Sequence, residues 1–302
     1  MFSPNIELSD FNKFELKDRS FIRQMIDRSK PLSCEYNFSN LFVWQNPSKL
    51  SWTMYRDTLL IYDGIEQVCF MPVGQELCPE KLLRLSENMQ DIGLGCGFTL
   101  VTKDYINAFP EVKENFIIKP DYGCTEYIYD AQKLCGLKGK KLTKKRNLIS
   151  QFKRLYGDYK IDLIKENDLQ NILEFSEQLL KRRDSVPETL CMEFEAIRQA
   201  LLFFALLNLE GILLSIKNKI VGFAVFSPLN KSTFDIHFEK SDLEFKGAAQ
   251  LITNETAKYL RDKCKYLNKE QDLGIKGLKR AKLSWEPDIL LNFYTIIPNV
   301  LS

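Results

Sequence analysis

The sequence predicts a mixed α/β (α+β) fold in two domains, with mixed sheets flanked by helices. Short strand-like runs alternate with apolar residues at helical spacing in both halves of the chain, and this mixed order is typical of α/β and α+β layers. The chain has 302 residues, of which 45% are hydrophobic and 27% are charged, as expected for a soluble globular protein of two domains. A chain of this length buries enough surface to fold without disulfides or a structural metal.

The first half of the sequence contains two helical patterns and several short strands. Residues 14–27 and 79–92 carry apolar side chains at helical spacing. Short apolar or alternating runs predict strands at 51–55, 59–62, 68–71, 98–102 and 126–129. The aromatic-rich run from Tyr36 to Trp44 is expected to fill the core of this half.

A basic stretch, residues 138–154, separates the two halves. It reads KGKKLTKKRNLISQFKR and contains no acidic residue. We interpret it as a domain junction that leads into a helix, so the predicted domains are residues 1–137 and residues 155–302. One interpretation assigns its lysines and arginines to an RNA or a phospholipid headgroup. The other is an exposed, solvated linker.

The second half of the sequence has a specific order of elements. A strand at 160–164 is followed by amphipathic helices at 168–183 and around 194–204, and then by a hairpin at 211–226 with its turn at Lys217-Asn218-Lys219. A strand at 233–240, a helix at 247–264 and a strand that ends near residue 272 complete the pattern. This order matches the acetyltransferase-type (GNAT) fold better than a Rossmann or TIM plan.

A predicted anion-binding turn, Lys246-Gly247-Ala248-Ala249, begins the helix at 247–264. Glycine and small residues permit a tight turn, and a helix start offers free N–H groups and a positive dipole end. The usual acetyl-CoA loop has glutamine or arginine three residues before the glycine, where this chain has Glu244. Because an acid disfavours an anionic cofactor there, a turn with a purely structural purpose is an equal alternative.

His237 is the only histidine, and it lies in a strand whose side chains alternate. Ile236 and Phe238 are expected to face the core, which places His237 on a polar face with Asp235 and Glu239. A structural imidazole and a base for an incoming amine are both consistent with this position.

Polar residues also gather where the strand near residue 272 ends. Carboxylates there suit a substrate ammonium or its proton, whereas a solvated loop with a helix cap at Asp272 is the alternative. Two lysines three residues apart share a helical face if a turn forms after this strand, and they then contact phosphates or solvent. We therefore predict catalytic roles for Asp272, Glu270 and His237, and substrate-binding roles for Asn268, Lys279 and Lys282.

The eight cysteines indicate a reducing compartment. No CxxC pair and no cysteine–histidine ligand spacing occurs, so we expect reduced thiols, no metal site and a cytoplasmic location. The apolar run from Ala200 to Leu207 is too short to cross a bilayer, and no transmembrane segment is expected. A net charge of +2 argues against a non-specific nucleic-acid coat. These features do not predict an oligomeric state.

Several motifs together resemble one bacterial family. They are YNFSNLFVW, YIYD with LKGKKLTKKRN, HFEK and NKEQDLGIKGLKRAKLSWEP, in this order along almost the whole chain. They look like those of soluble proteins similar to the C-terminal cytosolic domain of phosphatidylglycerol lysyltransferases. The resemblance implies two tandem GNAT-like domains of the acyl-CoA N-acyltransferase superfamily, related to the Fem-type aminoacyltransferases.

The resemblance also implies an activity. Members of the wider group move an aminoacyl ester from a charged tRNA to a lipid hydroxyl or a peptide amine, so the donor here is a charged tRNA or an acyl-CoA, with no tightly bound cofactor. By analogy, the acceptor or amino-acid pocket is lined by Asn268, Glu270 and Asp272, and the phosphates of the donor lie near Lys144, Lys145 and Arg146. A fold alone does not fix a function. A catalytically silent module that binds an amino acid, a lipid headgroup or RNA is therefore the second class.

Overall fold

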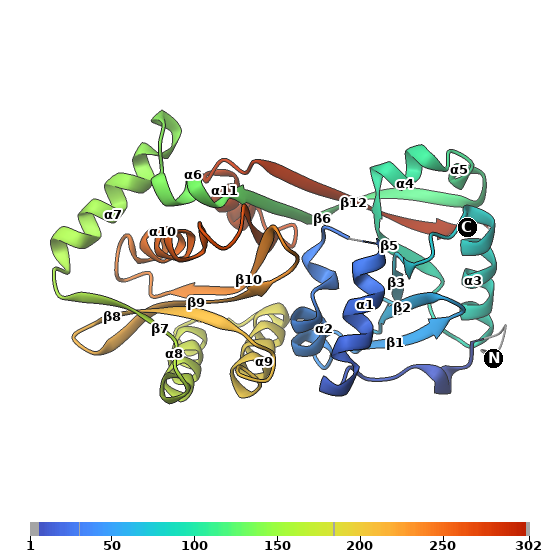
Figure 1. The fold of residues 1–302 in the computed structure, drawn as a ribbon, viewed down its shortest axis with the longest axis horizontal. Helices are drawn as coiled ribbons and strands as arrows, with labels where there is room; N and C mark the ends of the chain where they lie inside the picture. The colour runs from blue at the N-terminus through green and yellow to red at the C-terminus, as the bar shows by residue number, and fades with distance from the viewer. Residues whose placement is uncertain (1–5, 30, 184, 300–302) are drawn as a thin grey trace. The chain divides into compact units, whose positions relative to one another are not determined.

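Two units divide the chain in the computed structural model, which describes residues 6–29, 31–183 and 185–299 (Figure 1). Unit 1 contains the chain up to Thr125 and from Leu291, and unit 2 is Glu126–Leu290. The predicted domain limits at 137 and 155 differ from this division, because the basic stretch 138–154 lies within unit 2. The end of the chain returns to unit 1. Of the predicted domains, residues 1–5, 30, 184 and 300–302 lie outside the described residues.

Unit 1 is built on a mixed sheet with the strand order β1-β2-β3-β5-β12, followed by the first part of β6, and β4 pairs with β2. Strands β3 and β5 are parallel, whereas β1 and β2, β2 and β3, and β5 and β12 are antiparallel. The strands are β1 (Leu50–Tyr55), β2 (Thr58–Asp63), β3 (Val68–Phe70), β4 (Val73–Gly74), β5 (Gly97–Thr102), β6 (Phe116–Asp130) and β12 (Ile289–Pro298).

The helices of unit 1 begin at residues that cap or initiate them. Side-chain oxygens of Asn37 and Thr102 accept backbone N–H groups at the starts of α2 and α4, and Pro79 occupies the first turn of α3. Helix α2 covers the aromatic run, and almost all of its side chains are buried, so no helical periodicity marks it in the sequence. The helices are α1 (Arg19–Ser29), α2 (Phe38–Trp44), α3 (Pro79–Asp91), α4 (Lys103–Ala108), α5 (Val112–Asn115) and the 3-10 turns η1 (Leu8–Asp10), η2 (Leu16–Asp18) and η3 (Cys34–Tyr36).

The strand order of unit 2 runs from the last part of β6 as β6-β11-β10-β9-β8-β7, and this part of the sheet is mixed as well. Only β10 and β11 are parallel neighbours in it. The predicted hairpin is confirmed, because Lys217 and Asn218 both have a positive φ, of 49° and 61°, as a two-residue turn of this kind requires. The strands are β7 (Tyr159–Leu163), β8 (Glu210–Ile216), β9 (Lys219–Pro228), β10 (Thr233–Ser241) and β11 (Tyr266–Gln271).

The helices of unit 2 complete the predicted order of strand, two helices, hairpin, strand, helix and strand. Helices α8 and α9 cover one face of its sheet, and α10 covers the other (Figure 1). Among the described residues, no helix is both long and apolar enough to cross a membrane. The helices are α6 (Ala131–Gly136), α7 (Thr143–Leu155), α8 (Leu169–Lys181), α9 (Glu188–Leu202), α10 (Ala248–Leu260), α11 (Lys276–Leu283), η4 (Lys140–Leu142) and η5 (Glu166–Asp168).

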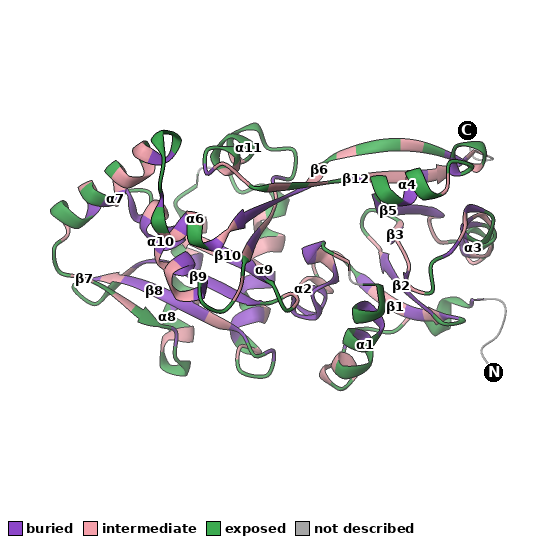
Figure 2. Cartoon of the chain, turned by 45° about the horizontal axis from the view of Figure 1, so that its top comes forward, coloured by how far each residue is buried: buried purple, intermediate pink, exposed green. Residues whose placement is uncertain are grey.

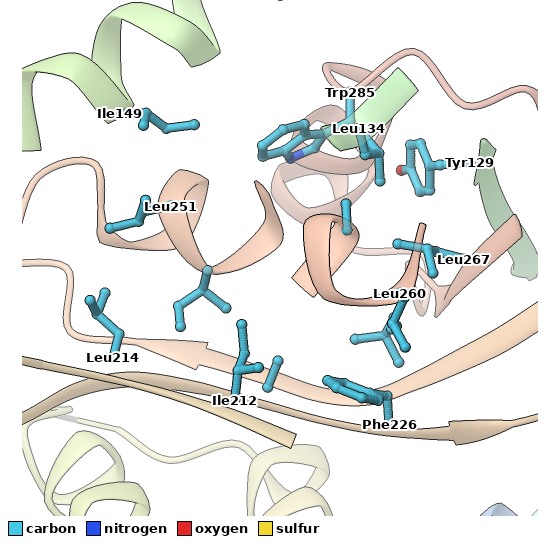
Figure 3. Close-up of a cluster of buried hydrophobic side chains, with 14 of the residues drawn as sticks. Tyr129, Leu134, Ile149, Ile212, Leu214, Phe226, Leu251, Leu260, Leu267 and Trp285 are labelled. Atoms are coloured by element: carbon cyan, nitrogen blue, oxygen red, sulfur yellow. The ribbon is translucent and has the colours of Figure 1, made fainter. Parts of the chain in front are cut away.

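The apolar core of unit 2 lies between α10 and the sheet. Figure 3 shows Leu251 and Leu260 in this cluster with Ile212, Leu214 and Phe226 of the sheet, and all five side chains are buried. Burying one large apolar side chain contributes about 1.5–3 kcal/mol, so this cluster fixes α10 against β8, β9 and β10. The core therefore holds the polar ends of β10 and β11 in defined positions.

Candidate functional site

The parallel strands β10 and β11 pair only where both begin. Their register runs from Thr233 opposite Tyr266 to Asp235 opposite Asn268, although both strands continue beyond these residues. Register shifts occur in the same region, at His237 in β10 and between residues 268 and 271 in β11. Bulges of this kind re-aim side chains and release backbone groups from the ladder, and they are common beside functional sites.

The bulge in β10 places His237 in a buried polar cluster. The Nε2 atom of His237 shares a hydrogen bond with Ser227 Oγ at 2.8 Å. Its Nδ1 atom lies 3.5 Å from Asp235 Oδ2 and 3.6 Å from Glu270 Oε1. Burial lowers the pKa of His237 to about 3, so the imidazole is neutral at physiological pH and offers one donor and one acceptor.

Glu270 occupies the bulge of β11 with a left-handed backbone, at a φ of 56°. Its N–H donates to Asn268 Oδ1 at 2.9 Å, and Asn268 Nδ2 donates to Glu126 Oε2 at 2.5 Å. Burial raises the pKa of Glu270 to about 8, against the opposing effect of Lys282. Among the described residues, nothing hydrogen-bonds to Glu270 Oε1. A strained, partly buried acid with an inaccessible, unpaired oxygen is a candidate for a functional group.

Asp272 is also buried, but both of its carboxylate oxygens accept hydrogen bonds. The Tyr127 hydroxyl donates to Oδ2, and the Gly274 N–H donates to Oδ1 at 2.8 Å. These contacts hold the turn that follows β11. The catalytic role predicted for Asp272 stays a prediction, and its hydrogen bonds give it a structural task.

Lys279 and Lys282 both lie on α11, the helix whose formation was left open in the sequence analysis. The amino group of Lys282 donates to the backbone oxygen of Lys269 at 2.5 Å and to that of Gln271. Lys279 is exposed. Lys282 therefore ties α11 to the end of β11, and only Lys279 presents its side chain to solvent.

Glu239 lies on the side of the sheet that carries α10. Its Oε1 atom accepts a hydrogen bond from Thr253 Oγ1 at 2.6 Å and lies 2.9 Å from the Lys269 amino group. The prediction that Glu239 shares a face with Asp235 and His237 is wrong. The bulge at His237 adds one residue to the strand, which reverses the side of every later side chain.

The predicted phosphate contacts on α7 have three different surroundings. Lys144 is exposed. Lys145 donates to Ser284 Oγ at 2.7 Å and lies 4.4 Å from the centre of the Trp285 ring, and burial lowers its pKa to about 8. Arg146 donates to the Gly139 carbonyl and to a threonine hydroxyl of the same turn, each at 2.8 Å. Arg146 thus closes the turn before α7, and Lys145 contacts the end of α11, whereas Lys144 presents its side chain to solvent.

The turn predicted from Lys246 to Ala249 is present, and packing explains its glycine. Gly247 has a φ of 97°, and a Cβ atom there would lie 2.4 Å from the Leu148 carbonyl oxygen of α7. Ala248 is buried as well, whereas Lys246 is exposed. Helix α7 covers Gly247. The role predicted for this turn in binding a donor stays a prediction.

Sequence reasoning did not assign site roles to Glu126, Ser227 or Tyr127. Glu126 is fully buried and begins the part of β6 that pairs with β11. The sequence feature that could have identified Glu126 is its position as an acidic residue at the start of the strand-like run EYIYD. Ser227 and Tyr127 carry no such signal. The partner of Tyr127 lies 145 residues away in the sequence, and Ser227 meets His237 only through the pairing of β9 with β10.

The fold and the diverging parallel strands define a tandem GNAT-like protein, as predicted. The structure is similar to a conserved protein of unknown function from Bacteroides thetaiotaomicron VPI-5482, with a TM-score of 0.86 and 30% identity over 96% of this chain and 99% of that chain. It is similar to the C-terminal domain of a putative lysylphosphatidylglycerol synthetase from Agrobacterium fabrum, with a TM-score of 0.62 and 13% identity over 93% and 92% of the chains. A tandem GNAT protein from the clavulanic acid biosynthesis pathway has a TM-score of 0.50 and 10% identity over 94% and 97%.

The family model described as phosphatidylglycerol lysyltransferase, C-terminal, matches residues 27–297, and the chain belongs to this family. The resemblance inferred from the motifs is confirmed. The two structures of lower identity show a shared fold and do not identify a substrate. The chain is therefore an acyl- or aminoacyl-transferase-like protein of this family.

Proposed function

We propose that the protein transfers an aminoacyl group from a charged tRNA to an amine or hydroxyl acceptor. The observation that carries this proposal is the partly buried Glu270, whose pKa is raised to about 8 at the point where β10 and β11 diverge. A general base works best when its pKa lies near the working pH. Membership of the family supplies the reaction class.

In the proposed reaction, the acceptor attacks the ester carbonyl carbon of the aminoacyl-tRNA. Glu270 takes the proton that the acceptor loses, and the bond between the carbonyl carbon and the ribose oxygen breaks. Glu270 passes this proton to the leaving ribose oxygen, so the tRNA ends in a free hydroxyl and the carboxylate is regenerated. Backbone N–H groups released where the strands diverge would stabilise the negative charge that develops on the carbonyl oxygen.

The acidic groups around Glu270 suit the ammonium group of an aminoacyl ester. Asp235 lies within the same cluster, because His237 Nδ1 is 3.5 Å from Asp235 and 3.6 Å from Glu270. Glu126 joins it through Asn268. Buried carboxylates favour a cationic ligand, so this cluster would hold the amino group of the donor.

Charged tRNA is favoured over acyl-CoA as the donor. Helix α7 covers Gly247, and the exposed Glu244 adds a negative charge near the turn that acyl-CoA would use. Lys144 and Lys145 lie together on α7 and would contact tRNA phosphates. The acceptor is an amine or hydroxyl of a lipid headgroup or peptide, and the reaction would take place in the cytoplasm, where charged tRNA is made.

The test is transfer of radiolabelled amino acids from charged tRNAs to lipid and peptide acceptors. We expect the wild-type rate to rise with pH as Glu270 loses its proton, to be half-maximal near pH 8 and to level about one pH unit higher. Glu270→Gln should reduce the rate about 100-fold or more, whereas the exposed Glu166→Gln should not change it. Transfer from acetyl-CoA alone would refute the choice of donor. Ligand-dependent thermal stabilisation without transfer from any donor would identify a silent binding module.

A further inference from the structure

The segment from Leu273 to Leu283 exposes both large aliphatic and cationic side chains. Leu273, Ile275 and Leu283 are 59%, 51% and 41% exposed, and no acidic residue occurs between the two leucines. Figure 2 shows that α11 and the loop before it are largely exposed. We define the α11 surface as the exposed residues Leu273, Ile275, Lys276, Lys279, Arg280 and Leu283.

The cations of the α11 surface are not neutralised by any residue that the structure describes. Among the described residues, no carboxylate forms an ion pair with Lys276, Lys279 or Arg280. These three side chains line an open depression together with Leu283 and Ser284. The apolar and the basic groups therefore occupy one continuous surface.

Contacts on the inner side of α11 hold this surface in place. Lys282 binds two backbone oxygens of β11, and the Lys282 carbonyl accepts the Tyr129 hydroxyl at 2.8 Å. Trp285 is buried in the core of unit 2, and Lys145 donates to Ser284 at 2.7 Å. The exposed leucines thus belong to an element that is held in place by contacts on its inner side.

We propose that the α11 surface docks on an anionic lipid bilayer. Aliphatic side chains enter the boundary between headgroups and acyl chains, while neighbouring lysines and arginines bind anionic headgroups. RNA would fit the cations but not the aliphatics, because proteins that bind RNA stack its bases on aromatic or arginine side chains. The segment from Leu273 to Leu283 contains no aromatic residue. Docking does not depend on the transfer reaction.

Cosedimentation with phosphatidylglycerol-containing vesicles and with pure phosphatidylcholine vesicles tests the docking. The full chain should bind the anionic vesicles, and added salt should weaken this binding. The combined change K276Q/K279Q/R280Q should lower the partition constant on the order of 100-fold, about fivefold for each charge. The combined change L273Q/I275Q should lower it by about tenfold or more without changing the net charge.

Matched controls change residues outside the α11 surface. K217Q/K219Q/K231Q removes three other exposed lysines of unit 2, and Leu243→Gln removes an aliphatic side chain that is 85% exposed. These controls should bind vesicles like the wild type, and unchanged melting temperatures would show that all variants fold.

The proposal is overturned if the full chain does not bind anionic vesicles, if the controls weaken binding as much as the α11 variants, or if the α11 cations are needed for tRNA binding and not for vesicle binding. Loss of transfer activity with retained vesicle binding would count against the proposed function alone.

Discussion

Glu270→Gln should change the stability of the protein in a pH-dependent manner. The pKa of Glu270 is raised from 4.5 to about 8 by burial, so the folded state binds a proton that the unfolded state has released between these pH values. The free energy of unfolding therefore falls as the pH rises from about 4.5 through 8. Glutamine keeps the volume of the side chain but cannot ionise, so the variant escapes this loss.

The magnitude follows from the size of the shift. At about 1.4 kcal/mol for each pKa unit, the wild type loses up to about 5 kcal/mol of stability above pH 8 relative to Glu270→Gln. With a denaturant dependence of about 2 kcal/mol per molar urea, the difference in midpoint would approach about 2 M. At pH 4.5 and below, the two proteins should unfold at nearly the same urea concentration.

Urea unfolding of both proteins at pH 5, 7 and 9 measures this difference. Other groups titrate in both proteins, so their effects cancel when the two midpoints are subtracted. The exposed Glu166→Gln serves as the control and should show no pH-dependent difference from the wild type. A constant difference between wild type and Glu270→Gln at all three pH values would refute the argument that burial holds this acid protonated.

Three further changes test the supports of the site by urea unfolding. Gly247→Ala places a Cβ atom 2.4 Å from a backbone oxygen at a positive φ and should cost about 2–4 kcal/mol, whereas Gly157→Ala, which meets nothing within 4 Å, should cost little. Tyr127→Phe removes the donor to Asp272 Oδ2 and should cost about 1–3 kcal/mol. Asn254→Ala removes the side-chain amide that donates to two carbonyls of α6, each at 2.8 Å, and should cost about 1–3 kcal/mol. A cost near zero for Gly247→Ala would contradict the expected clash, and a cost near zero for Tyr127→Phe or Asn254→Ala would contradict the importance of the hydrogen bonds removed.

Local patterns predicted the elements of unit 2 well. The alternation in β10 and the apolar spacing in α8 and α10 indicated their secondary structure because neighbouring residues alone determine which face of an element is apolar. The turn at Lys217 and Asn218 followed from the same local reasoning. Helix α2 and strand β12 are among the elements that escaped this approach. Helix α2 is buried on nearly all sides and shows no period, and β12 pairs with β5, almost 200 residues earlier.

The candidate site was predicted in part. The sequence identified Asn268, Glu270 and His237 by the concentration of polar groups at strand ends, and the structure brings them together. It did not reveal that Asp272 has both oxygens occupied or that Lys282 binds backbone carbonyls. Those assignments depend on which distant atoms each side chain meets.

By itself, the sequence determined the family, the mixed α/β architecture and the order of elements in unit 2, because these are encoded in motifs and in local apolar periodicity. Only the tertiary structure decided which acid is the candidate base. Burial raises the pKa of Glu270, whereas hydrogen bonds from Tyr127 and Gly274 occupy Asp272. The physical reason is that desolvation and hydrogen bonding depend on groups that the folded chain brings together from distant positions.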